Sequence, residues 1–241
     1  MKVEIFGLKF ENVENNKLFN PLNFKGLLTF PAAPALVNIF SDKKYYLSLK
    51  NSNYIFFDSG YLCLILLIIK NIKVNKFSGL LFLRKLIEKL KNSAFKILLI
   101  NPNLESSVKN RNFFKKKRIK NVYSYVAPLY NHKYQDKILL KKIKKINPDF
   151  IIINLGGGVQ EKLGLYLKNN IKKKITIVCT GAAIAFLTGA QAKIPNFIDK
   201  FYLGWLYRII FSPKLYVLRY LNSFKLIFML NKTNIKMYGK K

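Results

Sequence analysis

The chain has 241 residues, of which 51% are hydrophobic and 15% aromatic, so it can bury a sizeable core and global disorder is excluded. Its formal charge of +32 favours polyanionic partners such as anionic lipid, phosphorylated substrates or nucleic acid, although abundant Lys, Asn and Ile would also arise in an AT-rich genome. With two cysteines and a single histidine, His132 in a polar loop, the sequence offers no zinc constellation.

Short apolar runs predict seven strands, in chain order Val3–Phe6, Gly26–Phe30, Tyr54–Phe57, Lys96–Ile100, Asn121–Tyr125, Asp149–Asn154 and Ile175–Thr180. Helical periodicity between them predicts helices over Gly60–Ile72, Leu80–Leu90, Tyr134–Ile146 and Val159–Asn169. Alternating strands and helices favour an α/β fold with a Rossmann-like, mostly parallel sheet and helices on both faces. Two of the strands are continuously apolar, as strands buried on both faces should be.

From about Ile194 the chain is apolar, aromatic and basic, without strand alternation. We expect two helices there, Ile194–Phe211 and Pro213–Leu230, with Ser212 as N-cap and Pro213 as first residue of the second. Basic amphipathic helices with Trp and Tyr can lie in a lipid headgroup region, and ordinary core packing of these aromatics is an equal alternative. We therefore predict an α/β catalytic core, residues 1–193, and a C-terminal basic aromatic helical appendage that associates with a membrane, residues 194–241.

Sites in open α/β sheets form beyond the carboxyl ends of the strands, which narrows the choice among the 11 carboxylates. Asp149 opens its strand and is expected in a turn, whereas Glu88, Asp136 and Asp199 fall on helical segments and are expected at the surface. Asp58 ends a strand and precedes a helix. Its position alone fits a catalytic carboxylate and a helix N-cap equally well.

Three further strand ends offer polar or backbone groups to the same crevice. The glycine run before Gln160 and Glu161 precedes a helix, where free amides attract phosphate, although a tight turn alone would also explain it. The other two are Cys179-Thr180-Gly181 and the proline loop that begins at Thr29. The chain has no Asp-X-Asp pair, so we expect no carboxylate-held metal and no cofactor.

Three motifs in the second half of the chain occur in a fixed order: Gly156-Gly157-Gly158-Val159-Gln160-Glu161, then Gly181-Ala182-Ala183 with Phe186-Leu187-Thr188-Gly189, then Gly204-Trp205-Leu206-Tyr207-Arg208. Looser matches in the first half are Thr29, Asp58-Ser59-Gly60 and Phe77-Ser78-Gly79 followed by Leu83. Together they resemble the WecG/TagA/CpsF family of bacterial glycosyltransferases over roughly residues 27–230.

The resemblance implies an inverting, metal-independent glycosyltransferase that moves an N-acetylhexosamine or hexose from a UDP-sugar to a polyprenyl-diphosphate-linked glycan in cell-surface polysaccharide biosynthesis. Asp58 would be the general base. The substrate-binding residues would be Thr29, Lys76, Ser78, Gly157, Gly158, Gln160, Glu161 and Gly181. The residues toward the acceptor and an anionic membrane surface would be Trp205, Arg208, Lys214 and Arg219.

No apolar stretch reaches the ~18–20 residues that cross a bilayer, and the N-terminus is not typical of a signal peptide. We therefore expect a cytoplasmic protein that is peripheral on the inner face of the cell membrane, with homo-oligomer formation left open. No known nucleic-acid-binding motif is present, so we expect no nucleic-acid partner.

The chain departs from the family pattern at Pro31 in place of Asn, at Lys76 in place of Arg, and at Ala185 in place of Asp. These departures indicate altered donor specificity or lost activity. The alternatives are a non-catalytic membrane-surface scaffold of polysaccharide assembly and, less favoured, a basic nucleic-acid-binding protein.

Overall fold

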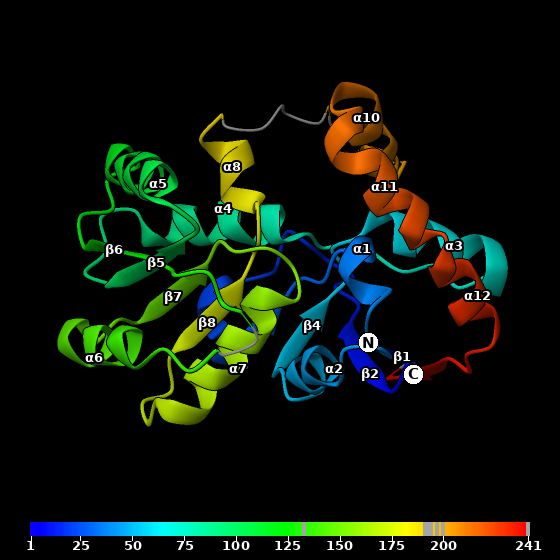
Figure 1. Ribbon diagram of the computed structural model, residues 1–241, viewed down its shortest axis with the longest axis horizontal. Coiled ribbons are helices and arrows are strands. Elements are labelled where there is room, and N and C mark those ends of the chain that lie inside the picture. Colours follow the sequence, from blue (N-terminus) through cyan, green and yellow to red (C-terminus); the bar gives the residue numbers. More distant parts are fainter. Residues whose placement is uncertain (132–133, 190–194, 196–197, 199–200, 240–241) are drawn as a thin grey trace.

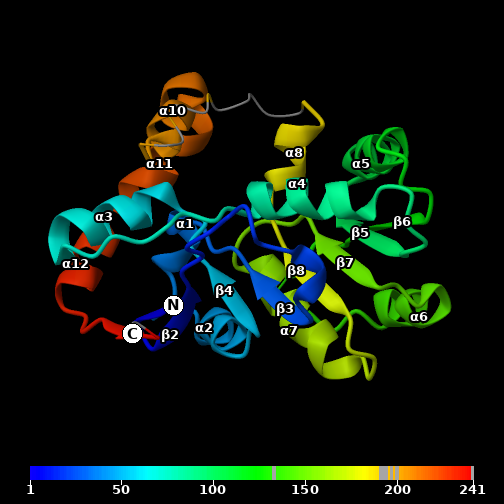
Figure 2. The same ribbon diagram turned by 180° about the vertical axis from the view of Figure 1, so that it is seen from behind.

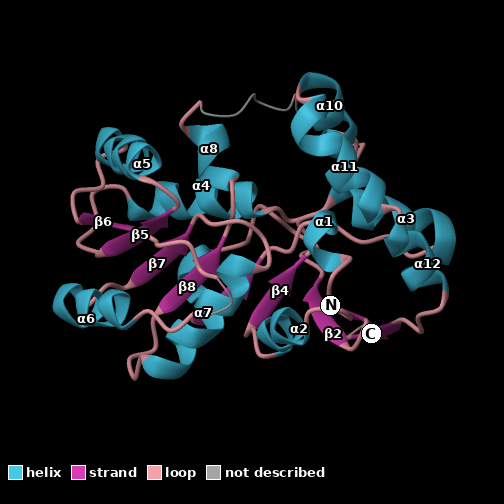
Figure 3. Ribbon diagram, in the orientation of Figure 1, coloured by secondary structure: helices cyan, strands magenta, loops and turns pink. Residues whose placement is uncertain are grey.

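A twisted sheet runs through the centre of the computed structural model, which describes all residues except 132–133, 190–194, 196–197, 199–200 and 240–241 (Figure 1). His132, Asp199 and the expected helix start at Ile194 therefore lie outside the described residues. Within them the sheet has nine strands in the order β6-β5-β7-β8-β3-β4-β2-β1-β9. Helices cover both faces, so the predicted α/β class is confirmed (Figure 3).

The seven predicted strands are all present, and two more were not predicted. The strands are β1 (Lys2–Ile5), β2 (Leu8–Glu11), β3 (Gly26–Thr29), β4 (Tyr54–Phe56), β5 (Ile97–Asn101), β6 (Val122–Val126), β7 (Phe150–Ile153), β8 (Thr176–Cys179) and β9 (Lys236–Tyr238). The run from β6 to β2 is parallel, and β1 pairs antiparallel with both β2 and β9. The carboxyl ends of β5, β7, β8, β3 and β4 therefore lie along one edge of the sheet.

The helices form two layers against the sheet. Their bounds are η1 (Pro21–Asn23), α1 (Ala33–Leu36), α2 (Lys43–Lys50), α3 (Gly60–Lys70), α4 (Gly79–Leu90), α5 (Leu104–Lys116), α6 (Lys137–Ile146), α7 (Val159–Asn170), α8 (Ala183–Leu187), α10 (Gly204–Phe211), α11 (Pro213–Ser223) and α12 (Lys225–Asn231). Hydrophobic clusters join α4, α5 and α8 to one face and α6 and α7 to the other. The reverse view shows the same two layers, with α10, α11 and α12 beside α3 (Figure 2).

Polar side chains at the first turns decide where several helices begin. Ser59 Oγ accepts from the Leu62 amide at 3.2 Å, and Ser78 Oγ accepts from the Leu81 amide at 3.2 Å, which starts α3 and α4. Asp136 caps α6 in the same way, so that helix begins at Lys137 and not at Tyr134.

Asp136 is also buried, and its expected surface position is wrong. Its Oδ2 accepts hydrogen bonds from the hydroxyls of Tyr125 and Tyr130, both at 2.8 Å. These partners lie 11 and 6 residues away in the chain, so the helical pattern around Asp136 contained no sign of them.

The C-terminal segment packs on the sheet edge and departs from the predicted pair of helices. The expected helix from Pro213 to Leu230 is divided into α11 and α12, and the buried Ser223 hydroxyl donates to the Arg219 carbonyl at 3.0 Å, a bond that bends helices. Ser212 occupies the N-cap position but makes no side-chain capping bond. Strand β9, which pairs with β1, follows the expected helices and was not predicted. Among the described residues, no helix is long and apolar enough to cross a bilayer.

Candidate active site

Asp58 lies between β4 and α3, and its carboxylate accepts a hydrogen bond from the first residue of another helix, α4. Because Ser59 caps α3, Asp58 is not needed as that helix's N-cap. Its Oδ1 instead accepts the backbone N–H of Gly79, the first residue of α4, at 2.8 Å. The amide end of a helix favours a negative charge nearby. Asp58 is thus a half-buried carboxylate fixed at the carboxyl edge of the sheet.

A cleft of about 400 Å³ opens at the start of α4, the helix whose first amide Asp58 accepts. Two predicted binding residues, Lys76 and Ser78, line it, and Arg84 adds a second cation that the sequence motifs did not indicate. Burial raises the pKa of the Cys63 thiol to about 12, with Lys76 lowering it and Asp58 raising it. Ser78 and Leu80, which line the cleft, flank Gly79, whose amide Asp58 accepts, so the cleft lies next to the carboxylate.

Tyr202, from the C-terminal segment, closes one side of this cleft. Its hydroxyl donates to the Val74 carbonyl at 3.1 Å, on the loop that carries Lys76. A Cβ placed on Gly60 would lie 2.8 Å from the Tyr202 carbonyl oxygen, closer than real side chains approach. Glycine in Asp58-Ser59-Gly60 is therefore required by the passage of the C-terminal segment over the start of α3.

Three buried hydrogen-bonding atoms near Asp58 have no partner among the described residues: Tyr61 Oη, Trp205 Nε1 and Arg208 Nε. The Trp205 ring packs edge-on against Tyr61 at 5.1 Å and lies 5.8 Å from Tyr220. Burial raises the pKa of Tyr220, whereas the charge and hydrogen bond of Arg208 lower it. Tyr61 lies in the first turn of α3, three residues after Asp58, so this cluster lies near the carboxylate. Two of the three atoms can only donate, which makes the cluster suited to an anion.

The predicted membrane and acceptor residues do not share one environment. Trp205 is held against Tyr61 and Tyr220, and Arg208 lies over the Phe186 ring at 4.8 Å, whereas Lys214 and Arg219 are exposed. The apolar side chains that the C-terminal segment exposes most are different ones: Phe201, Ile210, Phe211, Leu215, Leu218 and Phe228, each at least 60% exposed. Helical periodicity did not distinguish them because aromatics occur on more than one face of these helices.

The glycine turn before α7 is organised by the two residues that follow it. Glu161 is fully buried, and its carboxylate accepts from the Gly158 amide at 2.6 Å and from Gln160 Nε2 at 3.0 Å. Gln160 Oε1 accepts from the Gly181 amide at 2.7 Å, which ties the ends of β7 and β8 together. The predicted residues Gln160, Glu161 and Gly181 therefore meet, but the Gly158 amide is occupied within the protein and is not open to a phosphate.

Two other predicted contacts also have structural partners. Thr29 is fully buried, and its hydroxyl donates to the Tyr54 carbonyl of the neighbouring strand at 3.4 Å. A Cβ on Gly157 would lie 3.0 Å from the Ala35 side chain, so this glycine permits the close approach of α1. Within the described ranges, no group of three His, Cys, Asp or Glu side chains could hold a metal ion.

Burial raises the pKa of Glu161 from 4.5 to about 7, opposed by hydrogen bonds from the backbone and Gln160 and by Lys162. Between these values the folded protein holds a proton that the unfolded chain releases. The free energy of unfolding should therefore fall as pH rises from about 4.5 through about 7, on the order of 3 kcal/mol at about 1.4 kcal/mol per pKa unit. Glu161→Gln should lose this slope in urea unfolding followed by circular dichroism. Glu88→Gln, at an exposed ion pair, should keep the pH dependence. Equal pH dependence in both variants would show that Glu161 is not its source.

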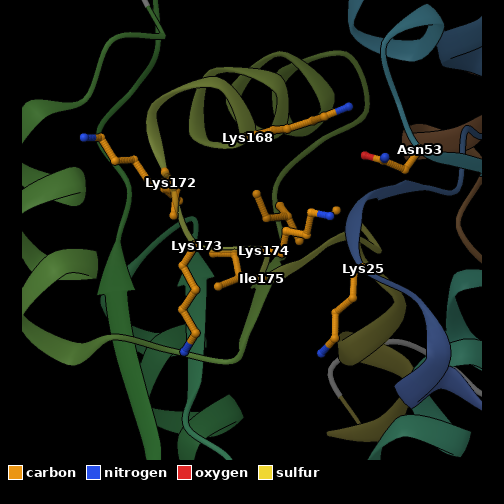
Figure 4. Close-up of a pocket in the computed structure, with 10 residues that line it drawn as sticks. Lys25, Asn53, Lys168, Lys172, Lys173, Lys174 and Ile175 are labelled. Carbon is orange, nitrogen blue, oxygen red and sulfur yellow. The ribbon is translucent and has the colours of Figure 1, made fainter.

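A second cavity, of about 320 Å³, lies at the opposite edge of the sheet, by the starts of β3 and β8. Its lining includes Lys25, Lys168, Lys172, Lys173 and Lys174. Figure 4 shows the ammonium groups of these lysines pointing in different directions. Lys168 donates to the Asn51 carbonyl and Lys173 pairs with Asp149. Because the charges do not converge, this cavity lacks the geometry of an anion site. Asp149, just before β7, accepts the Lys96 amide at 2.9 Å through its Oδ2.

The comparisons with known proteins cover nearly the whole chain. The model of the glycosyl transferase WecG/TagA/CpsF family matches residues 3–239. A Staphylococcus aureus (strain MRSA252) protein named N-acetylglucosaminyldiphosphoundecaprenol N-acetyl-beta-D-mannosaminyltransferase is 23% identical over 224 residues, which cover 88% of this chain and 86% of the relative. Proteins of the same name from strains NCTC 8325 / PS 47 and COL are 24% identical over the same shares of each chain.

Proposed function

The chain belongs to the glycosyl transferase WecG/TagA/CpsF family, and from that premise we propose that it transfers a sugar from a UDP-sugar to a lipid-linked glycan in cell-surface polysaccharide biosynthesis. The relatives' name specifies an N-acetylmannosaminyl group and a diphosphoundecaprenol-linked N-acetylglucosamine. An N-acetylhexosamine donor and a polyprenyl-diphosphate acceptor are accordingly the first substrates to test.

The proposed reaction is a single displacement that inverts the anomeric carbon. Asp58 accepts the proton of the acceptor hydroxyl while that oxygen forms the new bond to the anomeric carbon, and the bond to the nucleoside diphosphate breaks. General-base assistance of this kind contributes about 10²–10⁴-fold. In a metal-independent enzyme, side-chain cations and backbone amides must stabilise the negative charge that develops on the diphosphate. Lys76 and Arg84, which line the cleft, are the cations we assign to this role.

The observation that carries this proposal is the set of unpartnered donors beside the carboxylate. Buried polar atoms in native proteins are nearly always paired, so Trp205 Nε1, Arg208 Nε and Tyr61 Oη need a reason to be open. A diphosphate supplies acceptor oxygens and negative charge to all three, and hydrogen bonds to a charged acceptor are about twice as strong as neutral ones. Their position next to Asp58 fits a lipid-linked acceptor whose hydroxyl is presented to that carboxylate.

The test is the transfer of a radiolabelled sugar from UDP-N-acetylhexosamines and UDP-hexoses to a synthetic N-acetylglucosaminyl-diphosphopolyprenol, with and without a chelator. We expect transfer that survives chelation. If the protein binds vesicles but transfers none of these sugars, a non-catalytic scaffold explains it better than an enzyme.

Membrane association should depend on the exposed apolar face of α10–α12. Leu215 and Leu218 are 61% and 72% exposed on α11, next to exposed Lys214 and Arg219. Burying a leucine is worth about 1.5–3 kcal/mol, so the double change Leu215→Ser with Leu218→Ser should weaken binding to vesicles containing anionic lipid at least about tenfold. Sedimentation with such vesicles measures this. The matched control is Leu129→Ser with Ile138→Ser, 92% and 72% exposed; Ile138 is on α6 and Leu129 precedes it in the chain. Figure 1 shows α6 away from α11. Equal losses in both pairs would contradict a specific docking face.

A further inference from the structure

Polar residues end or follow three neighbouring strands on one face of the sheet. Asn101 ends β5, Asn154 follows β7 and Thr180 follows β8, and the strand register sets them side by side. Side chains alternate along a strand, so each faces the same way as the residue two positions earlier. Those earlier residues all lie in the cluster that joins the sheet to α4, α5 and α8: Leu99, Ile152 and Val178.

A chain of amide hydrogen bonds fixes how Asn154 is turned. Asn101 Oδ1 accepts from Asn110 Nδ2 at 2.6 Å and from Asn154 Nδ2 at 3.0 Å. Asn101 Nδ2 in turn donates to Ser124 Oγ at 2.9 Å and to the Leu99 carbonyl at 3.4 Å. Because a carbonyl can only accept, this contact orients Asn101, and Asn101 orients Asn154. Asn154 Oδ1 must therefore point away from the network.

Asn101, Asn154 and Thr180 form a polar row across the strand ends. Two oxygens in this row are left without a partner among the described residues, Asn154 Oδ1 and Thr180 Oγ1. Both residues are only 7% exposed, and both atoms are shielded from solvent. A buried polar atom without a partner costs about 1–3 kcal/mol. Two such atoms on adjacent strand ends, at the edge where α/β folds bind ligands, indicate a bound group that supplies the missing hydrogen bonds.

The row begins next to the proposed general base and leads away from it. Gly79, whose amide binds Asp58, packs against Thr180: a Cβ on this glycine would lie 3.4 Å from the Thr180 Cα. Asn154 is three strand spacings from Asp58 along the sheet, about 14 Å at about 4.8 Å per spacing. If the reacting carbon of the donor sits at Asp58, a group at Asn154 is beyond the sugar and belongs to the nucleoside.

We propose that Asn154 Oδ1 and Thr180 Oγ1 bind the nucleoside of the nucleotide-sugar donor, an inference that rests on the proposed function. Asn154 Oδ1 has only lone pairs to offer, so the group it meets must be a donor, either a ring N–H or a ribose hydroxyl. Helix α8, which follows Thr180, is five residues long and has no side-chain cap, so we place the entry to this site at its start.

The test compares Thr180→Val and Asn154→Ala with two matched controls by calorimetric titration of UDP and inorganic pyrophosphate. Thr176→Val changes the other end of β8, where the hydroxyl is buried but donates to the Phe24 carbonyl at 2.8 Å. Asn110→Ala removes the other donor to Asn101 and leaves Asn154 Oδ1 untouched. We expect Thr180→Val and Asn154→Ala to weaken UDP binding about tenfold each, without changing pyrophosphate binding. Thr180→Val should also unfold no earlier on heating than wild type, whereas both controls should unfold earlier and bind UDP normally.

UDP methylated at ring N3 and 2′-deoxy-UDP separate the two donor groups. One analogue should bind wild type more weakly than UDP does, yet bind Asn154→Ala as well as UDP does. That analogue lacks the group that donates a hydrogen bond to Asn154 Oδ1. Unchanged UDP binding by both site variants, or an equal loss for pyrophosphate, overturns the nucleoside assignment while wild-type sugar transfer leaves the proposed function standing. If wild type neither binds UDP nor transfers sugar, both proposals fail.

Discussion

Asp58→Asn should lose about 10²–10⁴-fold in turnover, the contribution of a general base, while the fold and donor affinity stay close to wild type. An asparagine oxygen can still accept the Gly79 amide that Asp58 Oδ1 accepts at 2.8 Å, so α4 keeps its place. What the variant cannot do is take the proton of the acceptor hydroxyl. Initial rates of radiolabelled sugar transfer at saturating donor measure turnover, and titration of UDP measures donor binding.

Two comparisons make this result specific to the proton transfer. Ser59→Ala, next in the chain, removes the cap of α3 and should cost about 1 kcal/mol of stability without a comparable loss of turnover. Asp58→Ala should lose both turnover and the hydrogen bond to α4, so it should be less stable than Asp58→Asn. Full activity of Asp58→Asn would show that another group takes the proton.

Truncation after residue 193 should leave a chain that does not fold cooperatively. The predicted boundary at 193/194 treats the C-terminal segment as an appendage, but the contacts lead us to expect the opposite result. Leu226 and Leu230 are fully buried in the cluster that contains β1 and β2, and β9 pairs with β1 at the sheet edge. Losing one buried leucine typically costs about 2–5 kcal/mol, against a total stability of about 5–15 kcal/mol for a domain. Thermal unfolding followed by circular dichroism is the measurement.

Point variants separate the buried and exposed faces of α12 in the full-length chain. Leu226→Ala should lower the midpoint of unfolding, whereas Phe228→Ala, at a side chain 71% exposed, should leave it nearly unchanged. A truncated chain that unfolds cooperatively near the wild-type midpoint would instead support the boundary at 193/194 and an independent core.

The strand-end position of Asp58 was predictable because continuously apolar runs such as Phe150–Ile153 mark buried parallel strands, and parallel strands end at one edge. The same reasoning located the turn that holds Gln160 and Glu161. These are local features: the apolar runs, glycines and helix starts lie within a few residues of one another. Local pattern was therefore sufficient for the α/β class and for most strands.

Only the tertiary structure decided which partners those elements have. In the sequence Asp58 was one of several carboxylates. The structure shows that it accepts the Gly79 amide near the cleft lined by Lys76, and that Ser59, not Asp58, caps α3. Trp205 packs inward on Tyr61 because the C-terminal segment crosses the start of α3, where Gly60 makes room for it.

The sequence by itself determined the fold class, the edge of the sheet where the parallel strands end, and the position of Asp58 at that edge. It did not determine that β9 pairs with β1 across more than two hundred residues, or that Asn154 and Thr180 each have an oxygen without a partner in the part of the chain that the structure describes. The physical reason is that strand pairing, burial and hydrogen-bond satisfaction depend on segments distant in the chain. Apolar periodicity predicts that one face of an element will be buried, but it does not predict which other segment will cover that face.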